Sequence, residues 1–315
     1  MAGGSTKAII AAFFANLGIA IAKLVGFFIT RSSSMLAESI HSFADTSNQG
    51  LLLYGGRAAG RDATPRHQFG FGRERYFWSF VVALVLFSLG SLFAIYEGIE
   101  KIRHPHEISS PAIAIGILIF GILLEGGSLR TAIVESRKVK RPDQSWWEFI
   151  RNARSPELPV VLLEDWGAMF GLVIALAAIS ISMGFDAPVW DGIGTLTIGV
   201  LLGIIAVVLA VEMKSLLIGE AATLSDQEAI EDAIEAGDDV DRLIHIRTQH
   251  IGPEDILVAA KVHFATGLTT TQLADAIDAT EKRIRAAVPM TRLIYLEPDL
   301  FDENHPPRSA DDEAH

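Results

Sequence analysis

Long apolar stretches recur along the chain up to about residue 217 and then stop. Five of them reach the length of about 20 residues that crosses a hydrocarbon layer roughly 30 Å thick: residues 8–30, 77–97, 111–129, 158–183 and 195–211. Residues 34–56 form a sixth candidate, which spans a membrane only if its interior polar residues have partners. The pattern predicts a six-transmembrane-helix bundle over residues 1–216.

From residue 217 onward the periodicity changes to that of a small α+β domain. The predicted elements, in chain order, are a helix ending at Ala236 with a capping box at Ser225 and Glu228, strands over 243–248 and 256–264, a helix capped by Thr270 or Thr271 and reaching Val288, and a strand over 292–296. This order, αββαβ, predicts a ferredoxin-like dimerisation domain over 217–301, with helices on one side of the sheet. Residues 302–315 are polar and acidic, and we expect them to be disordered.

Basic residues near the span ends fall mostly on one side of the predicted bundle. The basic loops carry Arg57, Arg61, Arg66, Arg73, Arg75, Arg130, Arg137, Lys138, Lys140, Arg141, Arg151 and Arg154, and the opposite loops carry Arg31, Lys101 and Arg103. Because basic loops stay on the cytoplasmic side, both termini are predicted to be cytoplasmic, in the plasma (inner) membrane. Within the second basic loop, residues 141–154 contain Trp146 and Trp147 and fit either a short interfacial helix or a linker.

Composition narrows the chemistry. Half of the residues are hydrophobic and the mean hydropathy is +0.35. Nearly all of the net charge of −12 falls after residue 216, which argues against nucleic acid as a partner. The chain has no cysteine, so a metal must be held by His, Asp or Glu. We find no nucleophile with a base and no phosphate-binding loop, and therefore expect no enzymatic activity.

Ionisable side chains inside the predicted spans are candidates for function, because they are costly in lipid. The densest group lies in the candidate span 34–56, which is the second span along the chain: Glu38, His41, Ser42, Asp45, Asn48 and Gln49. His41 and Asp45 are four residues apart, so they share one helix face with Cβ atoms about 5 to 6 Å apart. One imidazole and one carboxylate at this spacing suit a zinc-like cation. A buried hydrogen-bonded pair that fixes helix packing is the alternative.

A second acidic group, Glu164 and Asp165, lies in the apolar run 158–176. Adjacent helical residues point about 100° apart, so both need not face one ion. Asp165 is the expected ligand, whereas Glu164 fits a second ligand, a proton carrier or a hydrogen-bond partner of another helix. Glu125, expected near the cytoplasmic end of its span, fits either a cation pathway or a simple interface position.

Several segments resemble one known family. Residues 23–53, which contain the run Ser32 to Gln49, resemble the first two helices of the cation diffusion facilitators, the zinc-exporter family. Similar segments of that family are also found at residues 67–75, 96–99 and 216–221. The resemblance covers nearly the whole chain, and the block from His41 to Asp45 is its most specific part.

The resemblance implies a tetrahedral metal site with two ligands from the second helix and two, four residues apart, from the fifth. His41 and Asp45 match the first pair, and Asp165 matches the later position of the second. The earlier position falls on Val161, which cannot bind metal, so Glu164 or a water would complete the shell. The Glu164–Asp165 pair looks most like the branch related to the ninth human zinc transporter.

The C-terminal domain departs from the members that bind zinc there. Ala260 and Tyr295 stand where those members have histidines, and Glu297 precedes Pro298. His245, His250 and His263 do not match that pattern and are interpreted as strand and loop residues. We therefore expect the domain to dimerise without a bridging zinc.

Together these features predict a homodimer in a lipid bilayer that exports a divalent cation in exchange for protons by alternating access. Zinc is the expected ion, and manganese, cobalt and iron fit the same ligands. The metal is cargo, and no resident cofactor is expected. The alternatives are a non-transporting membrane scaffold or metal sensor that acts through its acidic domain, and a proton-coupled transporter of an organic solute.

Overall fold

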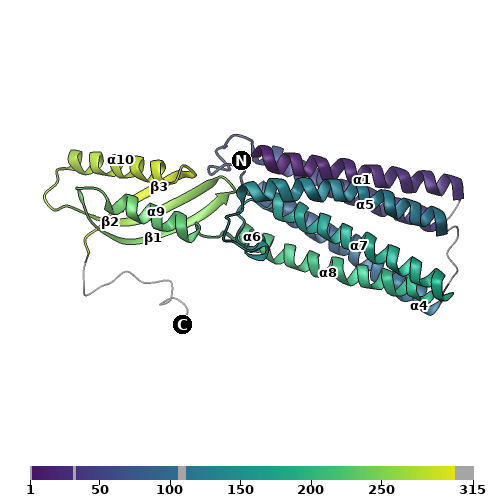
Figure 1. Cartoon of the computed structure of the whole chain (residues 1–315). Coiled ribbons are helices and arrows are strands. Elements are labelled where there is room, and N and C mark those ends of the chain that lie inside the picture. The colour runs from purple at the N-terminus through teal and green to yellow at the C-terminus, as the bar shows by residue number, and fades with distance from the viewer. Residues whose placement is uncertain (1, 31–32, 106–110, 302–315) are drawn as a thin grey trace. The chain divides into compact units, whose positions relative to one another are not determined.

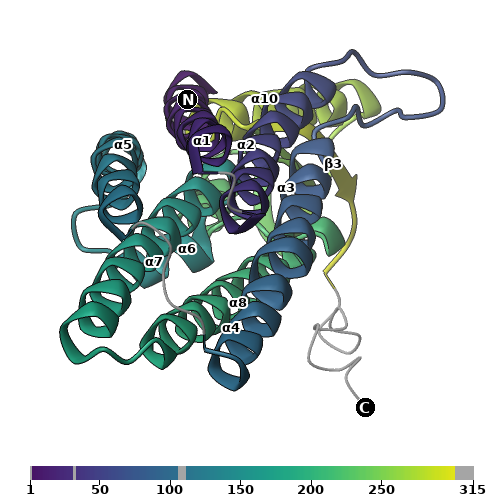
Figure 2. The same cartoon turned by 90° about the vertical axis from the view of Figure 1, so that its right-hand side faces the viewer.

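The computed structural model describes residues 2–30, 33–105 and 111–301, apart from the side chains of residues 2–5, 30, 33–38, 40, 41, 44, 86, 87 and 111. The chain divides into two compact units, one made of Met1–Thr64 with Glu74–Lys214, and one made of Pro65–Arg73 with Ser215–His315. Most of their elements are labelled in Figure 1, and α2 and α3 are labelled in Figure 2. The predicted disordered tail, 302–315, lies outside the described residues.

The first unit is helical. Its elements are α1 (Ala2–Thr30), α2 (Ser33–Ala59), α3 (Glu74–Val85), the π-helical turn η1 (Leu86–Ser91), α4 (Leu92–Arg103), α5 (Pro111–Val139), α6 (Trp146–Asn152), α7 (Glu157–Phe185) and α8 (Val189–Ile218). Among the described residues, five helical runs are long and apolar enough to cross a membrane: α1, the continuous run α3–η1–α4, α5, α7 and α8. The polar α2 is a sixth long helix, packed between α1 and α3 (Figure 2).

Helices α4 and α8 approach closely because glycines line their contact. A Cβ atom at Gly98 of α4 would lie 2.5 Å from the backbone nitrogen of Leu196. On α8, Gly199 faces the backbone of Ile95, and its carbonyl accepts a 2.7 Å hydrogen bond from the Ser91 hydroxyl. Small residues at such contacts allow helices to pack by dispersion in lipid, where the hydrophobic effect does not drive association.

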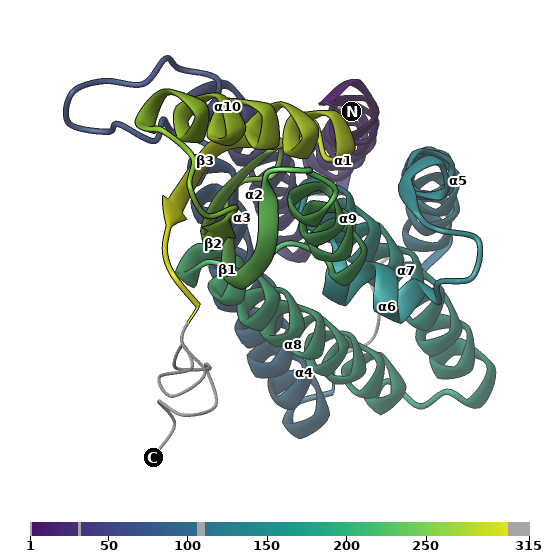
Figure 3. The same cartoon turned by 90° about the vertical axis from the view of Figure 1, so that its left-hand side faces the viewer.

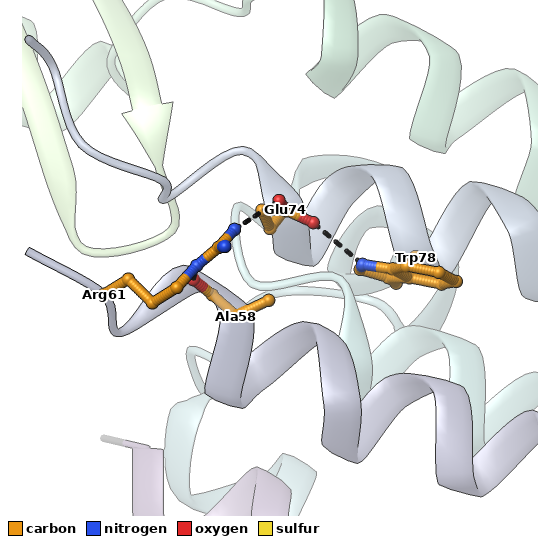
Figure 4. Close-up of polar contacts among 4 residues, drawn as sticks. All are labelled: Ala58, Arg61, Glu74 and Trp78. Carbon is orange, nitrogen blue, oxygen red and sulfur yellow. Dashed lines mark hydrogen bonds and ion pairs between the residues drawn. The ribbon is translucent and has the colours of Figure 1, made fainter. Parts of the chain in front are cut away.

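Polar contacts fix the corner where α2 ends and α3 begins (Figure 4). The Arg61 guanidinium donates to the Ala58 carbonyl at 2.9 Å and to the Glu74 carboxylate at 2.7 Å. The other oxygen of Glu74 accepts from the Trp78 indole at 2.8 Å. Glu74 also lies in the first turn of α3, where a negative charge is favoured by the helix dipole. This corner therefore returns the chain to the bundle in a defined place.

A buried ion pair joins α3 to α7 at the same end of the bundle. The Arg75 guanidinium contacts the Glu157 carboxylate, and both side chains are largely buried. In the chain just before α7, Ser145 and Glu148 form a capping box at the start of α6. Phe149 and Ile150 of α6 are buried. The structure thus confirms a short helix within residues 141–154.

The second unit has the predicted αββαβ order: α9 (Leu224–Glu235), β1 (Val240–Gly252), β2 (Asp255–Phe264), α10 (Thr270–Ala287) and β3 (Thr291–Pro298). The sheet order is β1-β2-β3, with β1 antiparallel and β3 parallel to β2 (Figure 3). Alternate residues of β2, from Ile256 to Phe264, are buried and pack with Ile230 of α9 and Ile284 of α10. Both helices therefore cover the same face of the sheet, and the predicted fold class is confirmed.

The two helix caps of this unit differ from the prediction. Thr223 caps α9 by accepting a hydrogen bond from the Asp226 amide at 3.2 Å, and Thr269 caps α10 in a capping box with Gln272. The predicted caps Ser225, Thr270 and Thr271 are already helical. A cap needs an extended backbone, and runs of adjacent Ser and Thr do not show which residue adopts it.

The connection between α2 and α3, residues 65–73, packs with the second unit. Gly72 lies against the turn between β1 and β2, where a Cβ atom would be 2.9 Å from the Cα of Gly252. Two glycines permit this approach of backbone to backbone. One polypeptide segment therefore leaves the helical bundle, contacts the sheet domain and returns to the bundle.

Candidate cation site in the helical bundle

A cavity of about 270 Å³ lies inside the first unit. It is lined by residues of α1, α2, η1, α4, α5, α7 and α8, and its charged lining residues are Lys23, Asp45, Glu97, Lys101, Glu125, Glu164, Asp165 and Asp191. Carboxylates thus outnumber ammonium groups along its wall. A buried space lined in this way favours a positively charged occupant.

Helix α2 contributes Asp45 to the cavity wall. His41 lies one helical turn earlier on α2, but its side chain is outside the described residues. Beside them, the Lys23 ammonium of α1 donates to the Ser42 hydroxyl at 3.1 Å. Of the expected ligand pair of α2, Asp45 therefore lines the cavity, and the role of His41 stays a prediction.

Glu164 of α7 is tied to α2 by two amides. The Gln49 side chain donates to one carboxylate oxygen at 2.8 Å and the Asn48 side chain donates to the other at 3.4 Å. All three side chains are buried. Of the three roles considered for Glu164, hydrogen bonding to another helix is the one that the structure shows, and the polar residues of α2 thereby gain partners inside the bundle.

Asp165 of α7 is held from α5. Its Oδ2 atom accepts a 2.7 Å hydrogen bond from the Ser128 hydroxyl, and only 1% of the residue is exposed. Val161, one turn earlier on α7, is fully buried. Ser128 was not predicted from the sequence, because it is not ionisable; its spacing of three from Glu125 was the available signal.

Glu125 of α5 also lies in the cavity wall, and only 2% of it is exposed. This burial favours the cation pathway over the interface position, because an interfacial carboxylate usually contacts water or headgroups. Its Oε2 atom has no hydrogen-bond partner among the described residues.

The far end of the cavity carries an ion-pair cluster between α4 and α8. The Lys101 ammonium lies 3.3 Å from Glu97 and 3.0 Å from Asp191. These residues lie near the ends of α4 and α8 that are remote from the α2–α3 connection. The cavity thus runs from the carboxylates in mid-bundle toward one end of the bundle.

The donors in mid-bundle are carboxylate oxygens, which bind hard and borderline divalent cations. Within the described part of the chain, no three His, Asp or Glu side chains are close enough to hold one ion together, and the His41 side chain lies outside that part. The structure therefore brings Asp45, Glu164 and Asp165 to one cavity without forming a closed coordination shell.

In the sheet domain, a lysine pairs with two carboxylates at the end of β3. The Lys261 ammonium lies 3.1 Å from Glu297 and 2.8 Å from Asp299. These carboxylates raise the pKa of Lys261, and the lysine in turn lowers the pKa of Asp299. Two carboxylates that would attract a metal here are already paired with a lysine.

Comparison with known proteins supports the family resemblance over most of the chain. Residues 9–218 match the model of the cation efflux transmembrane domain. The chain is 31% identical over 262 residues to a protein of Xenopus laevis called proton-coupled zinc antiporter SLC30A9, mitochondrial, covering 83% of this chain and 47% of that protein. It is 30% identical over 264 residues to metal tolerance protein C4 of Arabidopsis thaliana, covering 82% of this chain and 57% of that one.

The human protein that carries the same name as the Xenopus one is 29% identical over 243 residues, which cover 77% of this chain and 43% of that protein. This chain therefore spans about half the length of these relatives. Their similarity confirms the resemblance seen in the sequence, including the branch, and the family consists of transporters rather than enzymes. The chain is a multi-pass membrane protein and belongs to the cation efflux family.

Proposed function

We propose that this protein exports a divalent cation in exchange for protons by alternating access, with zinc as the expected ion. The observation that carries the proposal is the cavity inside the bundle, whose wall includes carboxylates from α2, α5 and α7. An acidic cavity among membrane-spanning helices gives a cation a path through lipid that an apolar bundle would not.

Zinc is favoured by the names of the Xenopus and human relatives, which are called zinc antiporters. Oxygen donors from Asp45 and Asp165 with one imidazole from His41 also suit manganese, cobalt and iron. The metal is the cargo and not a resident cofactor. Because a cation competes with protons for imidazole and carboxylate, protons arriving from the opposite side would displace it.

The proposal includes a homodimer, formed through the αββαβ domain without a bridging metal. Lys261 supports the absence of a bridging metal, because its ammonium already pairs with the acids at the end of β3. Cross-linking and mass measurement of the detergent-purified chain, with and without a chelator, test both parts. A dimer that persists in the chelator is expected, and a monomer would contradict the proposal.

The loop charges support an orientation with both termini in the cytoplasm. The plasma membrane is part of the proposal. The names of the Xenopus and human relatives say mitochondrial and give the plasma membrane no support. The native chain has no cysteine, so single cysteines placed at Gln144 and Gly184 report orientation without background. A membrane-impermeant thiol reagent added outside intact cells should label Gly184→Cys and spare Gln144→Cys; the reverse would overturn the orientation.

The deciding experiment is uptake of zinc and manganese into proteoliposomes under an imposed pH gradient. Asp45→Asn and Asp165→Asn should each abolish uptake, because each removes a charged donor from the cavity while keeping the side-chain size. Glu135→Gln is the matched control: Glu135 is a buried acid of the same bundle, but it is paired with Lys138 at 2.6 Å. It should transport like wild type.

Two outcomes would overturn the proposal. If purified wild type moves none of zinc, manganese, cobalt or iron, the scaffold or sensor reading replaces it. If it moves a proton-coupled organic solute with no competition from these metals, the cavity serves another cargo. Uptake that is unchanged when the pH gradient is collapsed would remove the proton coupling while leaving cation transport in place.

A further inference from the structure

The α5 face that carries Glu125 is directed at α7. Gly121, Glu125 and Ser128 follow one another at i, i+4 and i+7, which places them on one stripe of the helix. At one end of the stripe, a Cβ atom at Gly121 would lie 3.2 Å from the Leu172 side chain of α7. At the other end, Ser128 donates to Asp165 of α7 at 2.7 Å. Glu125 lies between these two contacts.

Glu125 is also within electrostatic range of the other charges in mid-bundle. The carboxylates of Asp165, Asp45 and Glu164 interact with it, as does the ammonium of Lys23. These five groups line the mid-bundle part of the cavity, where four carboxylates lie with one ammonium; Lys101 lies at the far end with Glu97 and Asp191. Such an excess of buried acid is costly in an apolar bundle unless a cation joins it.

The two buried glutamates of this site differ in how they are occupied. Glu164 accepts hydrogen bonds on both oxygens, from Gln49 and Asn48. Glu125 has one oxygen, Oε2, that is buried and accepts no hydrogen bond within the described part of the chain. A carboxylate whose oxygens are both engaged by amides is less available to a metal than one with an open oxygen.

Resting on the proposed function, we propose that Glu125 contacts the transported cation directly and supplies from α5 the donor that Val161 does not supply from α7. The shell then draws on three helices, with Asp45 of α2, Asp165 of α7 and Glu125 of α5. In the described structure these carboxylates are not close enough to hold one ion. Binding therefore requires the long Glu125 side chain and its neighbours to close on the cation. Glu164 instead holds α7 to α2 through its hydrogen bonds with Gln49 and Asn48.

The test is direct zinc binding to the detergent-purified full chain, measured by competition with a chromophoric zinc chelator. Glu125→Gln preserves shape and removes the charge, so zinc affinity should fall by at least about tenfold. Glu125→Asp, which keeps a shorter carboxylate, should recover part of the loss. Glu135→Gln on the same helix should bind as wild type does, since Glu135 already pairs with Lys138.

Glu164→Gln separates the two glutamates. It should lower the unfolding temperature of the bundle, because Gln49 and Asn48 lose a charged acceptor, with a smaller loss of zinc affinity than Glu125→Gln. Equal zinc binding by Glu125→Gln and wild type would overturn the inference and leave the proposed function intact. A wild type that neither binds nor transports zinc, manganese, cobalt or iron would overturn both. If Glu125→Gln loses zinc binding but also unfolds, Glu125→Asp decides the question. A folded Glu125→Asp protein that binds zinc no better than Glu125→Gln would refute the direct contact and show that Glu125 has a structural role.

Discussion

The two units of this chain treat their acidic residues in opposite ways. The second unit carries most of the excess negative charge, yet among the described residues every buried Asp or Glu belongs to the first: Glu125, Glu135, Glu157, Glu164 and Asp165. The core of the second unit is apolar, built from residues such as Ile234, Ile256 and Ile284. The number of acids in a segment therefore says little about function here, whereas their burial says much.

The difference follows from the surroundings. A surface carboxylate in water needs no partner, and the sheet domain can keep its charges outside and its aliphatic residues inside. A bundle in lipid faces apolar surroundings on its outside, so its polar groups must lie inside and find partners there. The partners differ: Arg75 for Glu157, Lys138 for Glu135, amides for Glu164 and Ser128 for Asp165.

The largest effect is expected where a buried charge loses its partner. Glu157→Ala removes the carboxylate that pairs with the largely buried Arg75 guanidinium of α3, which should cost about 3 to 5 kcal/mol. Thermal unfolding in detergent, followed by helix content, measures it. Arg61→Ala is the control, because its pair with Glu74 is more exposed and should cost about 1 kcal/mol or less. Equal losses in the two variants would show that burial does not set the value.

In the sheet domain a comparable effect should come from an apolar deletion. Ile256→Ala empties a fully buried position of β2 and should cost about 2 to 5 kcal/mol. Hydrogen exchange read by mass spectrometry locates the loss: β2 and β3 should lose protection while α5 and α7 keep theirs. The control is Leu257→Ala at the next, less buried position. Loss of protection throughout the bundle would contradict the independence of the two cores.

A smaller effect is expected for a residue that orients a donor. Ser128→Ala removes the hydrogen bond that holds Asp165, and zinc affinity should fall by about 10- to 100-fold. The fold itself should change little, since Ala has a similar size. Thr131→Ala is the control and should leave affinity unchanged, because Thr131, three residues later, donates to the Gly127 carbonyl of its own helix. No change in Ser128→Ala would show that Asp165 is oriented without it.

The smallest effect belongs to the surface cluster of the sheet domain. Lys261 lowers the pKa of Asp299, so the carboxylate stabilises the fold above its ordinary pKa, and this contribution disappears as the pH falls through the lowered pKa. Wild type should therefore be slightly more stable than Asp299→Asn at neutral pH, and the two should converge in acid. Unfolding temperatures at a series of pH values measure this. A difference that grows on acidification would have the wrong sign.

Many elements could be read from local pattern. The apolar runs predicted the spans because lipid imposes length and hydropathy locally. The span predicted at residues 77–97 is longer in the structure and extends over Glu74–Arg103. Alternation in 256–264 predicted β2, since one face of the strand is buried. The helix caps at Thr223 and Thr269 were missed, because neighbouring hydroxyl residues offer the same chemistry and only the backbone path selects among them.

The sequence by itself determined that this is a helical membrane protein with an αββαβ domain, and that Asp45, Glu164 and Asp165 lie in long helices. Periodicity, hydropathy and motif spacing are properties of neighbouring residues, so they can be read along the chain. Only the tertiary structure decided that Glu164 is bonded to Gln49 and Asn48, that Ser128 holds Asp165, and that Glu125 lies in the cavity. Those facts join helices distant in sequence, and which faces meet is fixed by packing across the whole bundle.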